Sequence, residues 1–305
     1  MFPEKMLSLG KKRSVIRELF EYGKIRKEQI GAENVFDFSL GNPSVAPPDC
    51  VNETIIDLVK NTSNIELHGY TSAQGDATVR SAVSDYINKN FGTHLTPNHI
   101  YMTVGAAASL TITIHALCEG NDEFVVFAPF FPEYRVFVEN AGAKLIINRL
   151  TSDQFDIDFD ALERSLTPQT KAVILNSPNN PSGVVIKKAS IERLCAVLKQ
   201  KEQQYGHPIF LISDEPYREL VYDDIEVPYL MNYYDNTIVC YSFSKSLSLP
   251  GERIGYIAVC DRCTQEQDLY AAICGAGRAL GYVCAPSLFQ RVAANCLGST
   301  SDISA

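Results

Sequence analysis

The sequence contains no tryptophan, and its five histidines show none of the spacings that metal-binding sites use. We therefore expect no metal site. One cysteine pair, Cys260 and Cys263, has the spacing of a metal or redox pair. Because no second pair and no histidine lie nearby, we interpret it as a coincidence at a strand end.

The chain also lacks long uncharged apolar runs and an excess of basic residues. With 27 Lys and Arg against 36 Asp and Glu, its formal net charge is −9. This acidic balance argues against nucleic acid or an anionic membrane as the main partner. The lack of an apolar run argues against a transmembrane helix. Residues 1–6 carry no apolar stretch like that of a signal peptide, so we expect a cytoplasmic protein.

What remains is an ordinary globular composition, with 46% hydrophobic and 21% charged residues. A chain of 305 residues is long enough for one large core, or for a large core and a smaller domain. The nine cysteines are scattered and odd in number. In a chain without a secretion signal, this favours reduced thiols over a disulfide framework.

Hydrophobic periodicity predicts helices over residues 8–30, 49–60 and 77–91. A short strand is expected over residues 35–40, ending at a turn of Gly41, Asn42 and Pro43.

From residue 100 onward, short apolar runs alternate with helical segments. Strands are predicted at 100–104, 123–127, 144–150, 171–176, 209–213, 237–241 and 254–259. Helices are predicted at 105–118, 132–141, 158–165, 189–204 and 288–297. Because the strands are apolar throughout, they are expected to be covered on both faces. The pattern predicts an α/β domain with a mostly parallel, doubly covered sheet.

The most informative stretch is residues 242–255, between the last two predicted strands. Lys245 lies there in an expected loop, where desolvation lowers the pKa of its amine and lets it form a Schiff base with a carbonyl. Ser242, Ser244 and Arg253 offer donors for a phosphate beside it. Alone, the pattern is more often a polar turn with a solvated lysine. The residues at other strand ends favour the site for a phosphorylated aldehyde.

Asp214 directly follows a buried strand, where an unpaired carboxylate is costly. A protonated pyridine nitrogen is a suitable cationic partner, and the charged ring then acts as an electron sink. Tyr217 is placed to donate its phenol to the ring's 3-oxygen, although simple packing is the alternative. For Asp214 the alternative is a cap at the start of a following short helix.

Three further strand ends carry unusual residues. Gly105, Ala106 and Ala107 open a helix with small residues, which lets backbone N–H groups approach an anion. Phe131 is placed to stack on a flat ring, and Asn180 offers an amide. Each has an ordinary alternative: tight packing for the helix start, core packing for Phe131 and a plain turn for Asn180.

Together these residues resemble the class I/II aminotransferases, the aspartate-aminotransferase-like fold-type I enzymes that use pyridoxal 5′-phosphate. The resemblance covers most of the chain, from about residue 41 to residue 288. Its strongest motifs are residues 176–183, 213–217 and 242–255. It implies the large domain of that fold, together with the N-terminal segment of a small domain.

The resemblance implies catalytic roles for Lys245, Asp214 and Tyr217. Lys245 would carry the cofactor as a Schiff base and move the proton of the substrate Cα. Asp214 would pair with the pyridine nitrogen. Asn180 and Tyr217 would hydrogen-bond the 3-oxygen, and Phe131 would stack on the ring.

The resemblance also implies a phosphate site and a substrate site. The complete set of implied cofactor-binding residues is Tyr70, Gly105, Ala106, Ala107, Phe131, Asn180, Asp214, Tyr217, Ser242, Ser244, Lys245 and Arg253. Tyr70 would reach the phosphate of a neighbouring subunit, so a homodimer is implied. The implied substrate-binding residues are Gly41, Asn180 and Arg278, the last reaching across the dimer. A turn glycine and a surface arginine are the alternatives for Gly41 and Arg278.

The expected domains are residues 1–46, an N-terminal helix and segment of the small domain, and residues 47–290, the cofactor-binding large domain. Residues 291–305 are expected to begin a truncated C-terminal segment. Relatives continue into a small domain that supplies the arginine for the substrate α-carboxylate. We therefore expect this chain to be a fragment whose cofactor site is complete and whose substrate site is not.

The leading hypothesis is transfer of an amino group from an L-amino acid to a 2-oxo acid, with aspartate and glutamate as candidate donors. A carbon–sulfur β-lyase or a decarboxylase is the alternative with the same cofactor, because the pocket chooses which bond breaks. A non-catalytic regulatory module that binds the cofactor is the alternative from another class. The acidic balance and the short segment before residue 40 argue against it.

Overall fold

The computed structural model describes residues 2–11, 15–39, 41–151 and 154–302. The chain forms two compact units, Met1–Ser44 and Val45–Ala305. Among the described residues, none of the helices combines the length and the apolar character needed to span a bilayer.

The first unit is helical. It contains α1 (Glu4–Lys11), α2 (Val15–Ile30) and the 3-10 turn η1 (Ala32–Asn34). The single helix predicted over residues 8–30 is therefore two helices, and residues 12–14 lie outside the described part. The strand predicted over 35–40 is wrong for residues 35–39, and residue 40 is not described. Phe36 and Phe38 are 83% and 92% exposed, and a strand without a hydrogen-bonded partner is not stable.

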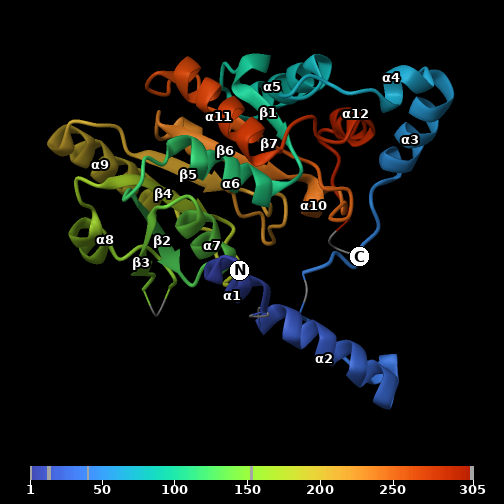
Figure 1. Cartoon of the computed structure of the whole chain (residues 1–305), viewed down its shortest axis with the longest axis horizontal. Helices are drawn as coiled ribbons and strands as arrows, with labels where there is room; N and C mark the ends of the chain where they lie inside the picture. Colours follow the sequence, from blue (N-terminus) through green and yellow to red (C-terminus); the bar gives the residue numbers. More distant parts are fainter. Residues whose placement is uncertain (1, 12–14, 40, 152–153, 303–305) are drawn as a thin grey trace. The chain divides into compact units, whose positions relative to one another are not determined.

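The second unit is built on one seven-stranded sheet, counted over its described residues (Figure 1). The strands are β1 (Ile100–Thr103), β2 (Glu123–Ala128), β3 (Lys144–Arg149), β4 (Thr170–Asn176), β5 (Phe210–Asp214), β6 (Thr237–Ser242) and β7 (Gly255–Val259). Their spatial order is β1-β7-β6-β5-β4-β2-β3. Strands β2 to β6 pair in parallel, and β7 pairs antiparallel with both neighbours. The predicted mostly parallel sheet is confirmed.

Helices cover both faces of this sheet. The helices of this unit are α3 (Asp49–Asn61), α4 (Asn64–His68), α5 (Ala77–Phe91), α6 (Ala106–Leu117), α7 (Glu133–Asn140), α8 (Phe159–Ser165), α9 (Lys188–Tyr205), α10 (Phe243–Ser246), α11 (Glu266–Leu280) and α12 (Ser287–Asn295). Alternate residues of β4 enter two separate hydrophobic clusters. Ala172 and Ile174 pack with the cluster of α5, α6, α11 and α12, and Val173 and Leu175 with that of α8 and α9. The central strands are largely apolar because both of their faces are buried, whereas the edge strand β3 is mostly exposed or half-buried.

The helix α11 was not predicted, since Gly275 and Gly277 weaken the helical pattern of its sequence. Gly277 is required by packing. A Cβ at this position would lie 2.2 Å from the hydroxyl oxygen of Tyr101, which donates a hydrogen bond to the Tyr282 carbonyl.

Candidate active site

The carboxyl ends of β4, β5 and β6 lie side by side and open into a cavity of about 170 Å³. Asn176 pairs with Asp214 in the register of β4 and β5, and Ser242 closes β6. Ligand sites in parallel sheets form at this edge. The predicted site residues that line the cavity are Ala106, Ala107, Phe131, Asn180, Asp214, Tyr217, Ser242, Ser244, Lys245 and Arg253.

Lys245 lies on α10, a single helical turn, and not in the loop predicted from the sequence. The turn forms because Ser242 caps it, accepting a hydrogen bond from the Ser244 backbone N–H at 3.2 Å. The Lys245 side chain is half-buried, and this burial lowers the pKa of its amine. A larger fraction of the amine is therefore neutral and nucleophilic than in an exposed lysine.

Asp214 is buried, with 4% of its surface exposed. Its Oδ2 accepts a hydrogen bond from the hydroxyl of Tyr134, and its Oδ1 has no hydrogen-bond partner among the described residues. Burial raises the pKa of this carboxyl to about 7, and the Tyr134 hydrogen bond opposes the rise. The side chain caps no helix, so the alternative weighed for it is not observed. A buried, unpartnered carboxylate oxygen suits a cationic ligand.

Asn180 and Tyr217 stand together although 37 residues separate them. The Asn180 side-chain amide donates to the Tyr217 hydroxyl at 3.2 Å. Asn176 fixes this part of the cavity, because its Oδ1 accepts from the Asn180 backbone N–H at 2.6 Å and its Nδ2 donates to the Asp214 carbonyl at 2.9 Å. Burial, together with the nearby Asp214, raises the pKa of the Tyr217 phenol. The phenol therefore remains a proton donor at neutral pH.

One end of the cavity is built from groups that bind anions. The start of α6 is adjacent to Gly105, whose φ of 97° favours glycine. A Cβ at Gly105 would lie 3.3 Å from Nη2 of Arg253, so glycine makes room for the guanidinium. The hydroxyl oxygens of Ser242 and Ser244 lie 2.7 Å apart on the adjoining turn. Helix N–H groups, hydroxyls and a guanidinium are donors that commonly bind phosphate in proteins.

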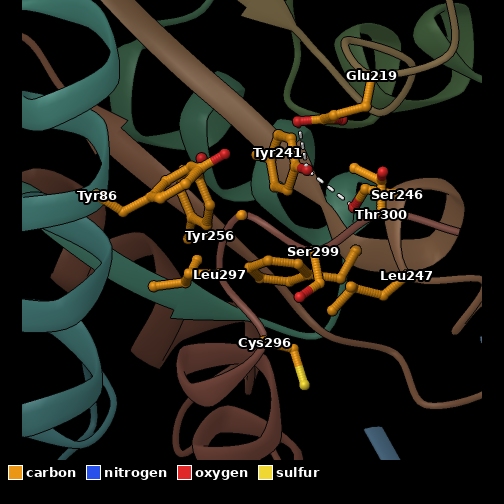
Figure 2. Close-up of a pocket in the computed structure, with 12 residues that line it drawn as sticks. Tyr86, Glu219, Tyr241, Ser246, Leu247, Tyr256, Cys296, Leu297, Ser299 and Thr300 are labelled. Atoms are coloured by element: carbon orange, nitrogen blue, oxygen red, sulfur yellow. Dashed lines mark hydrogen bonds between the residues drawn. The ribbon is translucent and has the colours of Figure 1, made fainter. Parts of the chain in front are cut away.

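A second polar network binds Ser246, the residue after Lys245 in α10 (Figure 2). The Tyr241 hydroxyl is hydrogen-bonded to both Glu219 Oε1 and Ser246 Oγ, each at 2.9 Å. The Ser246 carbonyl accepts from the Ser301 backbone N–H at 2.7 Å. Because Ser246 follows Lys245 directly, these bonds restrain the position of the lysine backbone.

Four predicted site residues do not line the cavity. One is Gly105, which directly precedes the lining residue Ala106. Tyr70 is 98% exposed on the loop after α4, and Arg278 is exposed on α11. Gly41 belongs to the first unit. Their implied roles, two of them in a neighbouring subunit, stay predictions.

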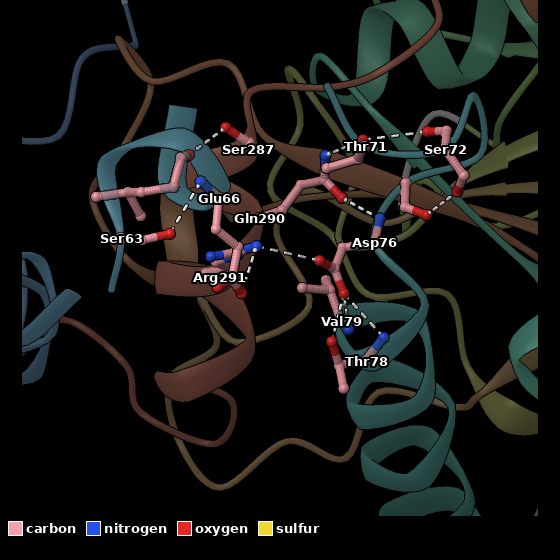
Figure 3. Close-up of polar contacts among 12 residues, drawn as sticks. Ser63, Glu66, Thr71, Ser72, Asp76, Thr78, Val79, Ser287, Gln290 and Arg291 are labelled. Atoms are coloured by element: carbon pink, nitrogen blue, oxygen red, sulfur yellow. Dashed lines mark hydrogen bonds and ion pairs between the residues drawn. The ribbon is translucent and has the colours of Figure 1, made fainter. Parts of the chain in front are cut away.

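The loop that follows Tyr70 is tightly held (Figure 3). Gln290 Oε1 accepts from the Asp76 backbone N–H at 2.8 Å, and Arg291 forms ion pairs with Asp76 at 3.6 Å and Glu66 at 3.5 Å. These contacts come from α12 and fix the start of α5, so the segment beside the exposed Tyr70 has a defined conformation.

Sequence reasoning missed Tyr134 as a site residue. It lies on α7 in a run of aromatic and charged residues that resembles an ordinary core pattern. Its contact with Asp214 joins residues 80 positions apart, and no local signal marks it.

Residues 33–304 match the family model for aminotransferase class I and II. The chain is 29% identical over 258 residues to the probable aspartate aminotransferase of Methanocaldococcus jannaschii, covering 85% of this chain and 64% of that protein. It is 27% identical over 269 residues to aromatic-amino-acid aminotransferase 2 of Thermococcus litoralis, covering 86% of this chain and 65% of that protein. The chain thus spans just under two thirds of the length of these relatives.

A solved aminotransferase from Eubacterium rectale is 55% identical, with a TM-score of 0.97, and the alignment covers 100% of this chain and 77% of that one. Its similarity extends over the sheet, the cavity and the elements around them. Enzymes of the matched family depend on pyridoxal 5′-phosphate. The chain belongs to the class I and II aminotransferases.

Proposed function

We propose that the protein transfers an amino group from an L-amino acid to a 2-oxo acid with pyridoxal 5′-phosphate as cofactor. One observation carries the proposal. A half-buried amine, on Lys245, and a buried carboxylate oxygen without a partner, on Asp214, line the same cavity. This pair matches the two polar ends of a pyridine aldehyde, and the anion site at the start of α6 matches a phosphate.

The cavity residues fit the parts of the cofactor separately. Asp214 Oδ1 suits the protonated ring nitrogen, and the Tyr217 phenol with the Asn180 amide suits the 3-oxygen. Phe131 supplies an aromatic face on the cavity wall. When bound, the charged ring withdraws electrons from the carbanion formed at the substrate Cα.

Lys245 has two tasks in this proposal. Its neutral amine would hold the cofactor at the aldehyde carbon, and burial favours this by lowering the amine pKa. With a substrate bound, Nζ would hold and move the proton of the substrate Cα. The network of Tyr241, Ser246 and Ser301 restrains the backbone from which the Lys245 side chain extends, and such a proton transfer depends on positioning.

The substrate and the assembly are parts of the same proposal. We infer that the Gly41 backbone and Asn180 bind the substrate, that Arg278 approaches an acidic side chain across a homodimer, and that Tyr70 reaches a partner's phosphate. The exposure of Tyr70 on a well-held loop supports this arrangement. Aspartate and glutamate are the first donors to test, since the Methanocaldococcus relative is named as a probable aspartate aminotransferase. A cytoplasmic location and domains at 1–46, 47–290 and 291–305 belong to the same proposal.

The alternatives gain no support from the relatives. The proteins reported above are named as aminotransferases, and none is named as a lyase, a decarboxylase or a regulator. No observation of the cavity favours them over amino transfer.

The test is spectroscopic. The purified chain is loaded with pyridoxal 5′-phosphate, and its absorbance is followed before and after addition of glutamate or aspartate. We expect a yellow species that glutamate converts to the pyridoxamine form. Lys245→Ala should abolish the yellow species, whereas the exposed Lys199→Ala on α9 should not. A chain that stays colourless, or that releases pyruvate from cystathionine without forming pyridoxamine, would contradict the proposal.

A further inference from the structure

Tyr134 makes a contact that the roles described so far do not use. Its hydroxyl donates to Oδ2 of Asp214, while Oδ1 of the same carboxylate has no described partner. The two oxygens are therefore distinct: Oδ2 is hydrogen-bonded within the protein, and Oδ1 is buried without a described partner in a residue that lines the cavity. Building on the proposed function, we propose that Tyr134 is a positioning residue for the cofactor ring nitrogen. It orients Asp214 so that Oδ1 meets the nitrogen, and it keeps the carboxylate charged.

The position of the phenol is fixed by its packing. Tyr134 is 1% exposed. Its ring meets the Phe131 ring edge-on, with centroids 5.7 Å apart, and lies parallel to the Phe130 ring at 6.3 Å. A ring held on two sides cannot swing its hydroxyl away from Asp214. Tyr134 therefore contacts both Asp214 and Phe131, the aromatic residue on the cavity wall.

The charges around Asp214 make this hydrogen bond necessary. Among the described residues, the titratable groups that act on the carboxylate are Tyr134 on α7, Glu215 and Tyr217 beside it in the chain, and Cys240 on β6, and none of these is a cation. The cationic side chains of Lys245 and Arg253 line the same cavity. Burial and the neighbouring Glu215 raise the pKa of Asp214, and Tyr134 is the described side chain that lowers it. Without the phenol, more of the carboxyl is protonated at neutral pH and cannot pair with a ring cation.

The experiment compares two probes. One is pyridoxal 5′-phosphate, and the other is its analogue with C–H in place of the ring nitrogen. Dissociation constants are measured by absorbance titration at pH 7.5 for the wild-type chain and for Tyr134→Phe. We expect Tyr134→Phe to weaken binding of pyridoxal 5′-phosphate about tenfold to a hundredfold, the range for a hydrogen bond to a charged group. Binding of the analogue should change less than about threefold, because it has no nitrogen for Asp214 to meet.

The matched control is Tyr234→Phe. Tyr234 is also 1% exposed, and its hydroxyl donates to the Ile209 carbonyl at 2.7 Å, in the other hydrophobic cluster. Removing this phenol lowers stability in the same way and should leave both dissociation constants unchanged. If Tyr134→Phe does not fold, 4-aminophenylalanine at position 134 keeps the shape and a weaker donor. It should then show a smaller loss, again confined to pyridoxal 5′-phosphate.

The outcomes separate this inference from the proposed function. If the wild-type chain binds neither probe, the proposed function fails. If it binds both and Tyr134→Phe weakens both equally, or neither, Tyr134 serves packing alone and the inference is overturned.

Discussion

Two consecutive buried carboxylates, Asp214 and Glu215, have opposite surroundings. Glu215 is 1% exposed, and both of its oxygens are bound: Oε1 accepts from Ser213 Oγ at 2.6 Å and Oε2 from Arg218 Nε at 2.5 Å. Asp214 keeps one oxygen without a described partner and has no described cation beside it. The protein itself thus supplies hydrogen-bond partners for both oxygens of Glu215. One oxygen of Asp214 has no described partner and remains available to a ligand.

Arg218, the cationic partner of Glu215, is itself held by several further contacts. Its guanidinium also donates to the carbonyls of Val227 at 3.1 Å and Pro228 at 3.4 Å. It lies 5.1 Å from the Phe91 ring centroid and 5.0 Å from that of Tyr229. A buried charge with this many partners stabilises the fold, whereas an unpartnered one lowers stability and is retained for function.

The largest expected effect comes from removing the partner of Glu215. Arg218→Met leaves a buried carboxylate without its cation, and we expect the free energy of unfolding to fall by about 3–5 kcal/mol. Urea unfolding of the unloaded chain measures this. Adding Glu215→Leu to Arg218→Met should recover most of the loss, because the uncompensated charge is then gone. A double variant as unstable as the single one would show that packing, not charge, causes the loss.

Asp214→Asn should affect cofactor affinity strongly and stability little. It removes a desolvated carboxyl and keeps its shape, so the unfolding free energy of the unloaded chain should change by no more than about 1 kcal/mol at pH 7 or should rise. Affinity for pyridoxal 5′-phosphate should fall about a hundredfold, since the ring cation loses its partner. Absorbance titration beside urea unfolding checks both. A large loss of stability with unchanged affinity would place Asp214 among the structural residues.

The pH dependence of stability should come from Asp214. Its carboxyl has a pKa of about 7 in the folded, unloaded chain, against an ordinary aspartate pKa of 3.8. Between these values the folded state binds more protons than the unfolded state, so this group's contribution to stability is greatest below pH 4 and is lost as pH rises toward 7. The expected slope is on the order of 1 kcal/mol per pH unit. It should be absent in Asp214→Asn, and an identical slope in both chains would refute the assignment.

The smallest expected effect is that of Ser213→Ala. Glu215 Oε1 loses its donor but the carboxylate keeps Arg218, so we expect a loss of about 1–2 kcal/mol in unfolding free energy. Affinity for pyridoxal 5′-phosphate should stay the same. A change in affinity as large as that of Asp214→Asn would mean that the two carboxylates are not separate in function.

Local sequence signals predicted most elements closely. The helix α5 has the predicted bounds because Asp76 caps its first turn and Gly92, at φ 69°, ends it. The predicted strands β2, β5 and β6 match within one residue at each end, since short apolar runs buried on both faces are distinctive. The predictions failed where packing overrides helix propensity, as in α11 with its two glycines. They also failed at residues 35–39, which pair with no strand among the described residues.

The sequence by itself determined the fold class and the family, because apolar strands, their spacing and the polar residues at their ends are all local features. It also named most of the residues that line the cavity, since parallel strands bring their carboxyl ends to one edge. Only the tertiary structure decided the antiparallel placing of β7 and the contact of Tyr134 with Asp214. These depend on which surfaces meet when distant segments pack together, and no pattern within one segment records that.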